Sequence, residues 1–263
     1  MRSGANPRLS RWRDERAANR RLGGRLALAS AATFLLAVPF TLLLLLVKSE
    51  SGWLERVDVG TAQRLHDVAR RSPDLVDFLE LVAFLTDPWV LRLVVLAAVV
   101  WLWRRGARRL AAWAATTTVI GGLLGIILKI LVLRARPSFD EPVAQSPGYS
   151  FPSGHALNSV LCAGVLILVF LPVLRHRGRV LAMVVAASVV LLTGFDRVAL
   201  GVHFVSDVLA GWVVALACLA ATAAGFEIWR REEGMAPSPV SEGIDPEARP
   251  EMTERHPADE APD

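Results

Sequence analysis

Three short clusters of polar residues combine side chains that are suited to binding or transferring phosphate. They lie at residues 129–137, 152–155 and 196–207, next to or inside long apolar runs. The residues among them that could act on phosphate are two histidines, a carboxylate partner and three cations. Cations and free backbone N–H groups bind phosphate oxygens, and an imidazole can attack phosphorus or donate a proton. The residue types therefore predict a phosphate-transfer site that has no metal-ligand set.

In the first cluster, Lys129 lies within an apolar run, and Arg136-Pro137 follows seven residues later. An ionisable side chain in a membrane helix is costly and is a candidate for function. Seven residues are about two helical turns, so both cations face the same way if the helix continues to Arg136. We predict that both bind phosphate. The alternative is that they are anchors that snorkel to the membrane interface.

The second cluster, Pro152-Ser153-Gly154-His155, precedes a long apolar run. A helix is predicted to begin here, and its free N–H groups suit an anion. Ser153 would cap the helix or bind phosphate, Gly154 lets the backbone approach closely, and His155 can donate a proton to a leaving oxygen. The alternative is a simple N-cap before a buried helix, with a structural histidine.

In the third cluster, His203 and Asp207 are four residues apart, which places them on one face of a predicted helix. A carboxylate in this position orients an imidazole and stabilises its positive charge. Arg197 adds a cation at the same level. A buried His–Asp hydrogen bond without catalytic function is the alternative for this pair alone.

Six apolar runs must position these clusters. The chain has 263 residues, of which 53% are hydrophobic. A membrane-crossing helix needs about 20 mostly apolar residues. The runs are Leu26–Val47, Leu93–Trp103, Leu110–Leu128, Ala156–Leu174, Val180–Phe195 and Val208–Phe226. They predict an all-α polytopic membrane protein, with six transmembrane helices in a bundle over residues 26–229. The first run is too long for a signal-peptide core, so we expect a retained span.

The positive charge follows the predicted topology. The net charge is +4, and arginine concentrates in four clusters at residues 2–25, 104–109, 175–179 and 230–231. With six spans, all four clusters lie on one side, which the positive-inside rule makes cytoplasmic. Both termini are then cytoplasmic in a multi-pass protein of the cell membrane, and the phosphate site is extracytoplasmic. The basic charge thus reflects topology, and no nucleic-acid partner is predicted.

Three further segments have predictions of their own. Residues 1–25 are expected to form a flexible, Arg-rich cytoplasmic arm. Residues 54–88 are predicted to form outer amphipathic helices broken near Ser72-Pro73, which act as a lid or entry gate or merely as a connector. Residues 230–263, rich in acidic residues and proline, are expected to be a disordered cytoplasmic tail. Cys162 and Cys218 are predicted to be buried apolar residues.

The three clusters resemble, in order and spacing, the signatures of the type 2 phosphatidic acid phosphatase superfamily, which includes bacterial undecaprenyl pyrophosphate phosphatases. Those signatures are Lys-(six residues)-Arg-Pro, Pro-Ser-Gly-His and Ser-Arg-(five residues)-His-(three residues)-Asp. Asp196 stands where the family usually has serine. A carboxylate there repels phosphate unless a cation neutralises it. Asp196 therefore either pairs with a neighbour or marks a changed substrate preference.

The resemblance implies a two-step mechanism without metal or cofactor. His203 would attack phosphorus to form a phosphohistidine, Asp207 would orient its ring, and His155 would protonate the leaving group. Water would then release inorganic phosphate. The groups implied to stabilise charge on the phosphate oxygens are Lys129, Arg136, Ser153, Gly154 and Arg197.

The function expected from these residues is that of an integral membrane lipid phosphatase, a metal-independent phosphoric ester or diphosphate hydrolase. A site at headgroup level suits an amphiphile, so its partners are the membrane and a lipid phosphate. Polyprenyl pyrophosphate is the first expectation, followed by phosphatidic acid-like lipids. Two alternatives stay open: a lipid-linked phosphotransferase, and a non-catalytic lipid-binding or transport relative.

Overall fold

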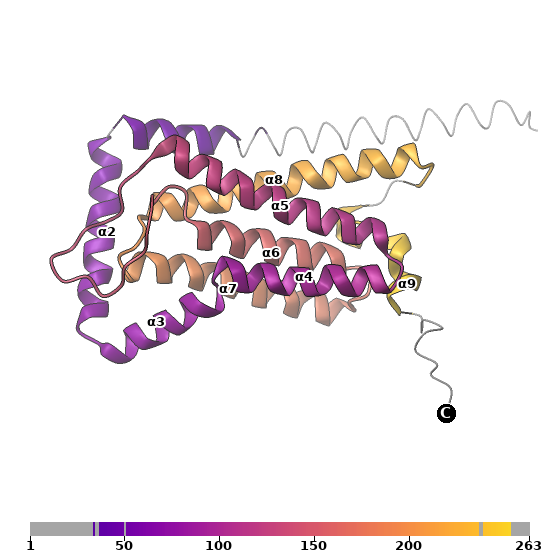
Figure 1. Cartoon of the computed structure of the whole chain (residues 1–263), viewed down its shortest axis with the longest axis horizontal. Helices are drawn as coiled ribbons and strands as arrows, with labels where there is room; N and C mark the ends of the chain where they lie inside the picture. Colours follow the sequence, from indigo (N-terminus) through magenta and orange to yellow (C-terminus); the bar gives the residue numbers. More distant parts are fainter. Residues whose placement is uncertain (1–33, 35–36, 50, 237–238, 254–263) are drawn as a thin grey trace, which may run out of the picture.

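The structure is a computed structural model that describes residues 34, 37–49, 51–236 and 239–253 (Figure 1). The prediction of an all-α fold is confirmed for these residues. A helical stretch, Ala37–Lys48, precedes the labelled helices. These are α2 (Gly52–Arg70), α3 (Pro73–Leu85), α4 (Pro88–Arg104), α5 (Arg108–Val132), α6 (Gly154–Phe170), α7 (His176–Ala199), α8 (Val205–Glu232) and α9 (Arg249–Thr253), with 3-10 turns at Val240–Glu242 and Pro246–Ala248.

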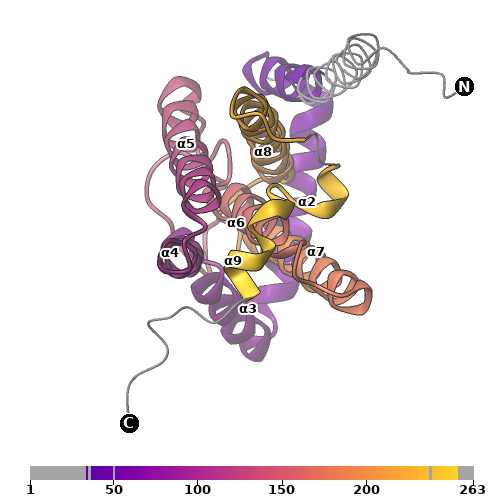
Figure 2. The ribbon, with the colours of Figure 1, turned by 90° about the vertical axis from the view of Figure 1, so that its right-hand side faces the viewer.

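Helix α6 lies at the centre of the bundle, with α4, α5, α7 and α8 around it (Figure 2). Its apolar side chains Leu157, Leu161 and Val165 are almost fully buried. A helix that is apolar on all sides is expected in such a position. The outer helices instead expose large apolar side chains, for example Ile130 of α5 and Leu181 of α7. The outer surface of the bundle is thus suited to lipid.

Several helices are long and apolar enough to cross a membrane. Among the described residues these are Pro73–Arg104, which joins α3 and α4, together with α5, α7 and α8. A fifth candidate is Ala37–Lys48 with α2, a pair bent by 90°. Helix α6 has 17 residues, fewer than each of the four candidate spans named first. A multi-pass membrane protein is thus supported, whereas a count of six spans stays a prediction.

Helix α2 crosses one end of the bundle (Figure 1). Its buried side, which includes Asp58, Ala62 and His66, faces the bundle. The chain breaks at Arg71-Ser72 before Pro73 begins α3, close to the predicted break. Proline is well tolerated at the first helical position, where its missing N–H has no partner to lose. The position of these helices on the outer membrane surface stays a prediction.

The prediction of a disordered tail is wrong for residues 239–253. Ile244, Ala248 and Met252 are buried in the main apolar core. Arg230, fully buried near the end of α8, contacts Asp245 at 3.3 Å and Glu247 at 2.9 Å. The acidic composition concealed this segment, because its carboxylates pair with arginines of the bundle. Helix α8 also continues to Glu232, past the predicted end of the domain at residue 229.

Three of the four arginine clusters meet at the end of the bundle opposite α2 (Figure 1). Asp245 lies 3.8 Å from Arg109 and 3.3 Å from Arg230. Arg179 donates a hydrogen bond to the carbonyl oxygen of Ser241 at 3.1 Å. The fourth cluster, in residues 2–25, lies outside the described residues, as does the predicted arm. We call this end the basic end.

Candidate active site

The first cluster is positioned by the end of α5 and the loop that follows. Helix α5 ends at Val132, and Leu133 takes the left-handed conformation with φ of 56°. The helix therefore does not continue to Arg136, and the argument from a shared helical face is wrong. Ser150 fixes the chain instead, because its backbone N–H donates to the oxygen of Arg134 at 2.9 Å and its hydroxyl to that of Ala135 at 2.8 Å.

Both cations of the first cluster nevertheless reach the same site. The guanidinium of Arg136 donates to the carbonyl oxygens of Gly148 at 3.0 Å and Val202 at 2.7 Å. Lys129 Nζ donates to the oxygen of Tyr149 at 2.6 Å. Burial lowers the pKa of Arg136 from its ordinary value, but a guanidinium stays charged at neutral pH. Arg136 and Lys129 therefore both bind carbonyl oxygens of the loop before α6, at residues 148 and 149.

His203 lies in the turn between α7 and α8, not on a helix as predicted. Gly201 makes this turn with φ of +69°, and any side chain there would also meet Phe139. The carbonyl oxygen of Arg197 accepts hydrogen bonds from the backbone N–H groups of Val202 at 3.2 Å and His203 at 3.1 Å. The backbone of the third cluster thus fixes its own histidine.

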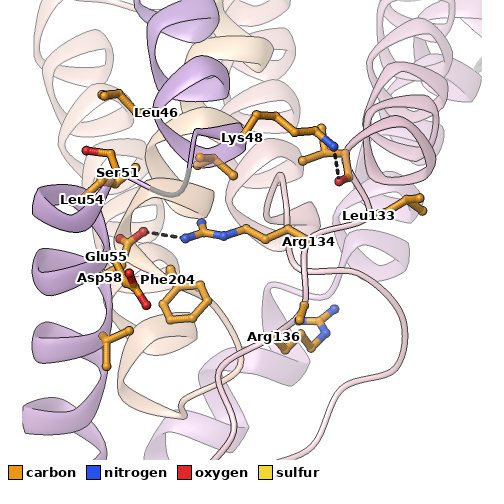
Figure 3. Close-up of a pocket in the computed structure, with 14 residues that line it drawn as sticks. Leu46, Lys48, Ser51, Leu54, Glu55, Asp58, Leu133, Arg134, Arg136 and Phe204 are labelled. Atoms are coloured by element: carbon orange, nitrogen blue, oxygen red, sulfur yellow. Dashed lines mark hydrogen bonds and ion pairs between the residues drawn. The ribbon is translucent and has the colours of Figure 1, made fainter.

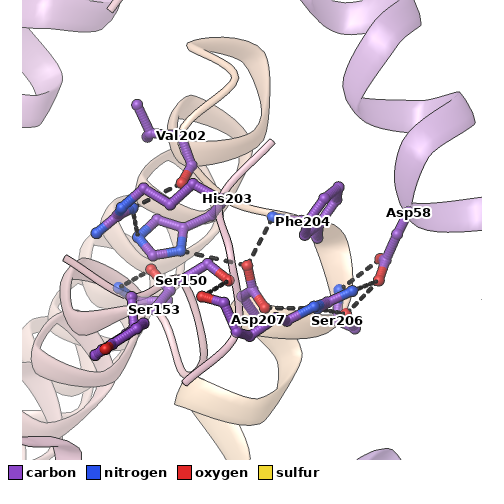
Figure 4. Close-up of polar contacts among 12 residues, drawn as sticks. Asp58, Ser150, Ser153, Val202, His203, Phe204, Ser206 and Asp207 are labelled. Carbon is purple, nitrogen blue, oxygen red and sulfur yellow. Dashed lines mark hydrogen bonds and ion pairs between the residues drawn. The ribbon is translucent and has the colours of Figure 1, made fainter. Parts of the chain in front are cut away.

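Asp207 faces His203 from the first turn of α8 (Figure 4). One carboxylate oxygen accepts from the N–H of Phe204 at 2.9 Å and lies 3.4 Å from His203 Nδ1. On the other side of the ring, Arg136 Nη1 lies 3.0 Å from Nε2. Arginine has no acceptor, so Nε2 must present its lone pair and the proton belongs on Nδ1, toward Asp207. This is the tautomer that a nucleophilic histidine needs.

The ring of His203 is buried, at 3% exposure. Burial lowers the pKa of His203 to about 4, although the carboxylate of Asp207 acts in the opposite direction. The imidazole is therefore neutral over the physiological pH range, and its Nε2 lone pair accepts a hydrogen bond from Arg136 that a bound phosphate would have to displace.

The second cluster begins α6 as predicted and is joined directly to α8. Ser153 caps the helix, since its hydroxyl accepts from the N–H of Ala156 at 3.4 Å, and its own N–H donates to the carbonyl oxygen of Asp207 at 2.9 Å. A Cβ at Gly211 of α8 would lie 2.8 Å from the oxygen of Ser153, which is too close. Glycine at 211 therefore lets α8 approach the beginning of α6, which brings His155 and His203 into one site.

His155 lines a cavity of about 330 Å³ together with Arg197, Phe84 and Asp87. Asp87 caps α4 by accepting from the N–H of Trp89 at 2.8 Å, and its other oxygen lies 3.8 Å from His155 Nε2. The cavity lies between α3 and the loop after α5, next to the turn that carries His203. Burial, together with the charges of Arg197 and Lys129, lowers the pKa of His155 to about 3, so the imidazole is neutral until an anion bound in the cavity favours its protonated, proton-donating form.

Asp196 and Arg197 form a buried ion pair, with Arg197 Nη2 and Asp196 Oδ2 2.5 Å apart. Of the two alternatives from the sequence, this is pairing with a neighbour. The carboxylate is thereby neutralised, but the guanidinium that is predicted to bind phosphate is already engaged. Arg197 Nε also donates to Asp196 Oδ2, at 2.7 Å, and Arg197 lines the cavity together with His155.

Sequence reasoning missed Asp58, Arg134 and Ser206. Arg134 lies inside the first cluster, which was its only signal, and it connects Asp58 of α2 to Asp207 (Figures 3 and 4). Nothing in the local sequence marks Asp58, because its partner is 76 residues away. Asp58 and Arg134 also border a second cavity of about 480 Å³ between α2 and the end of α5 (Figure 3).

The fold and the site define a class: an all-α membrane protein in which a neutral, carboxylate-paired histidine faces cations at one end of the bundle. The sequence model of the PAP2 superfamily matches residues 110–231, which contain all three clusters. Over residues 110–231 the chain is therefore similar to the PAP2 superfamily.

Two comparisons with individual proteins agree with this. Phosphatidylglycerophosphatase B of Bacillus subtilis (strain 168) is 39% identical over 99 residues, which are 36% of this chain and 47% of the relative. The chain thus matches about half the length of this curated relative. The crystal structure of a transmembrane PAP2 type phosphatidylglycerolphosphate phosphatase from Bacillus subtilis has a TM-score of 0.64 and 24% identity, and the match covers 75% of this chain and 96% of that one. This likeness shows the fold.

Proposed function

We propose that the chain is an integral membrane lipid phosphatase that hydrolyses the phosphate monoester or pyrophosphate of a lipid through a phosphohistidine. The observation that carries this proposal is the environment of His203. Its Nε2 lies 3.0 Å from a guanidinium nitrogen of Arg136, and its Nδ1 lies 3.4 Å from Asp207. The lone pair of Nε2 therefore points where the Arg136 cation attracts a phosphate.

In the first step, His203 Nε2 forms a bond to phosphorus while the bond from phosphorus to the lipid oxygen breaks. The ring becomes positively charged, and the carboxylate of Asp207 stabilises that charge. His155 transfers a proton to the departing oxygen, so the lipid leaves as an alcohol or, from a pyrophosphate, as a monophosphate. Arg136, Lys129 and the N–H groups at the beginning of α6 offset the negative charge on the remaining oxygens.

In the second step, a water molecule attacks the phosphohistidine. His155, now without its proton, accepts one from the water, and the bond between Nε2 and phosphorus breaks. Inorganic phosphate leaves, and both histidines return to their starting protonation states. His155 and water supply every proton that is transferred in the two steps.

The substrate that we propose first is phosphatidylglycerophosphate, since both relatives carry this activity in their names. Polyprenyl pyrophosphate and phosphatidic acid are the next candidates, because each places a phosphate at headgroup level. We place the site on the extracytoplasmic face, since the basic end lies opposite to it and basic ends are cytoplasmic.

A phosphate-release assay in detergent tests this function. The purified chain is given phosphatidylglycerophosphate, phosphatidic acid, a polyprenyl pyrophosphate and a soluble aryl phosphate, each with a His203→Ala control. Release from one of the lipids that is lost in the control supports the proposal. Release from the soluble ester alone, or equal release by His203→Ala, would overturn it.

A further inference from the structure

A row of three charged side chains runs from α2 to the catalytic turn. Arg134 donates from Nη2 to Asp58 Oδ2 at 2.8 Å and from Nη1 to Asp207 Oδ1 at 2.6 Å (Figure 4). The carboxylates are buried, at 1% exposure for Asp58 and 0% for Asp207, and the arginine is 17% exposed. Each carboxylate therefore depends on this one guanidinium for much of its charge compensation.

Asp58 also holds the beginning of α8. Its Oδ1 accepts from the backbone N–H of Ser206 at 3.0 Å, and its Oδ2 accepts from the Ser206 hydroxyl at 2.5 Å. The first N–H groups of a helix have no partner within the helix. A carboxylate from α2 supplies that partner here, one residue before Asp207.

The two carboxylate oxygens of Asp207 have different partners. Oδ1 accepts from Arg134, while Oδ2 accepts from the Phe204 N–H and faces His203 Nδ1. The Arg134 guanidinium also lies 4.4 Å from the centre of the Phe204 ring, on the residue that follows His203. Arg134 thus determines which oxygen of Asp207 is left for the histidine.

We propose that Asp58 and Arg134 are positioning residues for the reaction, which act through Asp207 to hold His203 in its nucleophilic tautomer. Asp58 holds one half of the guanidinium, so that Arg134 presents only its other half to Asp207. This inference rests on the proposed phosphatase function. Neither residue touches phosphate in this scheme.

In this row, the positive charge of Arg134 is shared between the carboxylates of Asp58 and Asp207. When residue 58 has no charge, Asp207 is the only one of the two partners that still attracts Arg134 as an anion. The guanidinium turns fully toward Asp207 and competes with His203 for its Oδ2. The imidazolium that forms during attack on phosphorus then loses part of its stabilisation, which raises the barrier of the chemical step and leaves substrate binding unchanged.

The first experiment compares Asp58→Asn with the unmodified chain in detergent. Asparagine keeps one oxygen, which can still accept from Arg134 and the Ser206 hydroxyl, but it loses the charge and the oxygen that accepts from the Ser206 N–H. The partners that orient a catalytic ligand typically contribute about ten- to hundredfold. We expect kcat to fall by about this factor, with KM unchanged. Asp67→Asn, the same change further along α2, is the matched control and should retain kcat.

The second experiment separates positioning from a purely structural role. Asp58→Asn is combined with Asp207→Asn, and the effects are compared as a double-mutant cycle. If Asp58 acts through Asp207, its substitution changes kcat little once Asp207 is already Asn. Multiplicative effects, or a kcat near that of the unmodified chain in Asp58→Asn, would overturn the inference. Arg134→Lys keeps the charge but lacks the planar fork that presents separate nitrogens to Asp58 and Asp207, and it serves as the second variant where Asp58→Asn folds poorly.

A readout that is independent of turnover keeps the two proposals distinguishable. The ring ¹⁵N shifts of His203, assigned by difference with His203→Gln, report which nitrogen carries the proton. We expect Asp58→Asn to move these shifts toward a mixture of tautomers. Unchanged shifts would overturn the inference even where the chain hydrolyses lipid phosphates. Absence of hydrolysis in the unmodified chain overturns the proposed function instead.

Discussion

Both ends of the helical bundle bury an arginine among carboxylates. At the end crossed by α2, Arg134 lies between Asp58 and Asp207. At the basic end, Arg230 contacts Asp245 and Glu247. The residue types and distances are similar, yet only one of the two arrangements is near a candidate nucleophile.

The two ends differ in the second partner of their carboxylates. Asp207 has a second oxygen that faces His203, so changes in Arg134 reach the histidine. Asp245 instead belongs to the C-terminal segment, and its remaining partner is Arg109 of α5. The ion pairs at one end therefore reach the carboxylate beside the candidate nucleophile, whereas those at the other end attach a chain segment. The comparison predicts that substitutions at the two ends separate activity from stability.

The largest effect is expected from His203→Ala. Without Nε2 there is no nucleophile for phosphorus, and turnover should fall by at least about a thousandfold, as when a triad member is removed from a protease. Phosphate release from a lipid substrate measures this. His176→Ala, at the exposed beginning of α7 near the basic end, is the control and should retain turnover. Similar losses in both variants would contradict the division between the two ends.

At the basic end, Arg230→Ala should destabilise the protein and leave kcat largely unchanged. Removing one partner of a buried pair leaves a buried charge uncompensated, at a cost on the order of 3 kcal/mol. Thermal unfolding in detergent and protease cleavage after residue 236 measure the loss of stability and the release of the C-terminal segment. Arg104→Ala, an exposed arginine at the same end, is the control. A fall in kcat without a fall in Tm would contradict a purely structural role for Arg230.

The pH dependence of kcat/KM is the third expectation. Because burial lowers the pKa of His203 to about 4, its Nε2 keeps the lone pair well below the ordinary histidine range. The His203 contribution to kcat/KM should stay level as the pH falls from 8 to about 5 and then decrease about tenfold per unit below pH 4. Detergent assays over this range measure it, and a loss centred at pH 6.5 would contradict it.

The smallest effect is expected from Asp196→Ser, which restores the residue usual in the family. Serine releases Arg197 from its ion pair, so the guanidinium gains freedom to bind phosphate. We expect KM to fall by a few-fold with kcat nearly unchanged, since an added charge-assisted hydrogen bond contributes about 1 kcal/mol. Asp77→Ser, on the exposed side of α3, is the control. A higher KM would show that the ion pair itself maintains the site.

The sequence predicted those parts of the site whose residues lie close together along the chain. Lys129, Ser153 and His155 could be found because their clusters are local and stand beside apolar runs. Arg136 was identified by its spacing from Lys129, although the helix ends before it. The helical-face argument failed there because an αL residue, Leu133, ends α5 early, and leucine carries no sequence signal for that conformation.

Long-range partners could not be predicted in the same way. Asp58 was read only as one polar residue of an amphipathic helix, since its contacts with Arg134 and Ser206 depend on how α2 crosses the bundle. The C-terminal segment did carry a signal: Ile244, Ala248 and Met252 are spaced by four residues, as on one helical face. The prediction of a disordered tail rested on the acidic composition alone and did not use that spacing.

The close crossing of α6 and α8 has a consequence for how this site can diversify. A backbone hydrogen bond from the Ser153 N–H to the Asp207 oxygen joins the segment that carries His155 to the segment that follows His203. The spacing of the two histidines is thus determined by main-chain atoms and by the glycine at 211, whereas the cavity walls come from α3 and the loop after α5. We therefore expect substitutions in those walls to change which group the cavity accepts without moving His155 relative to His203.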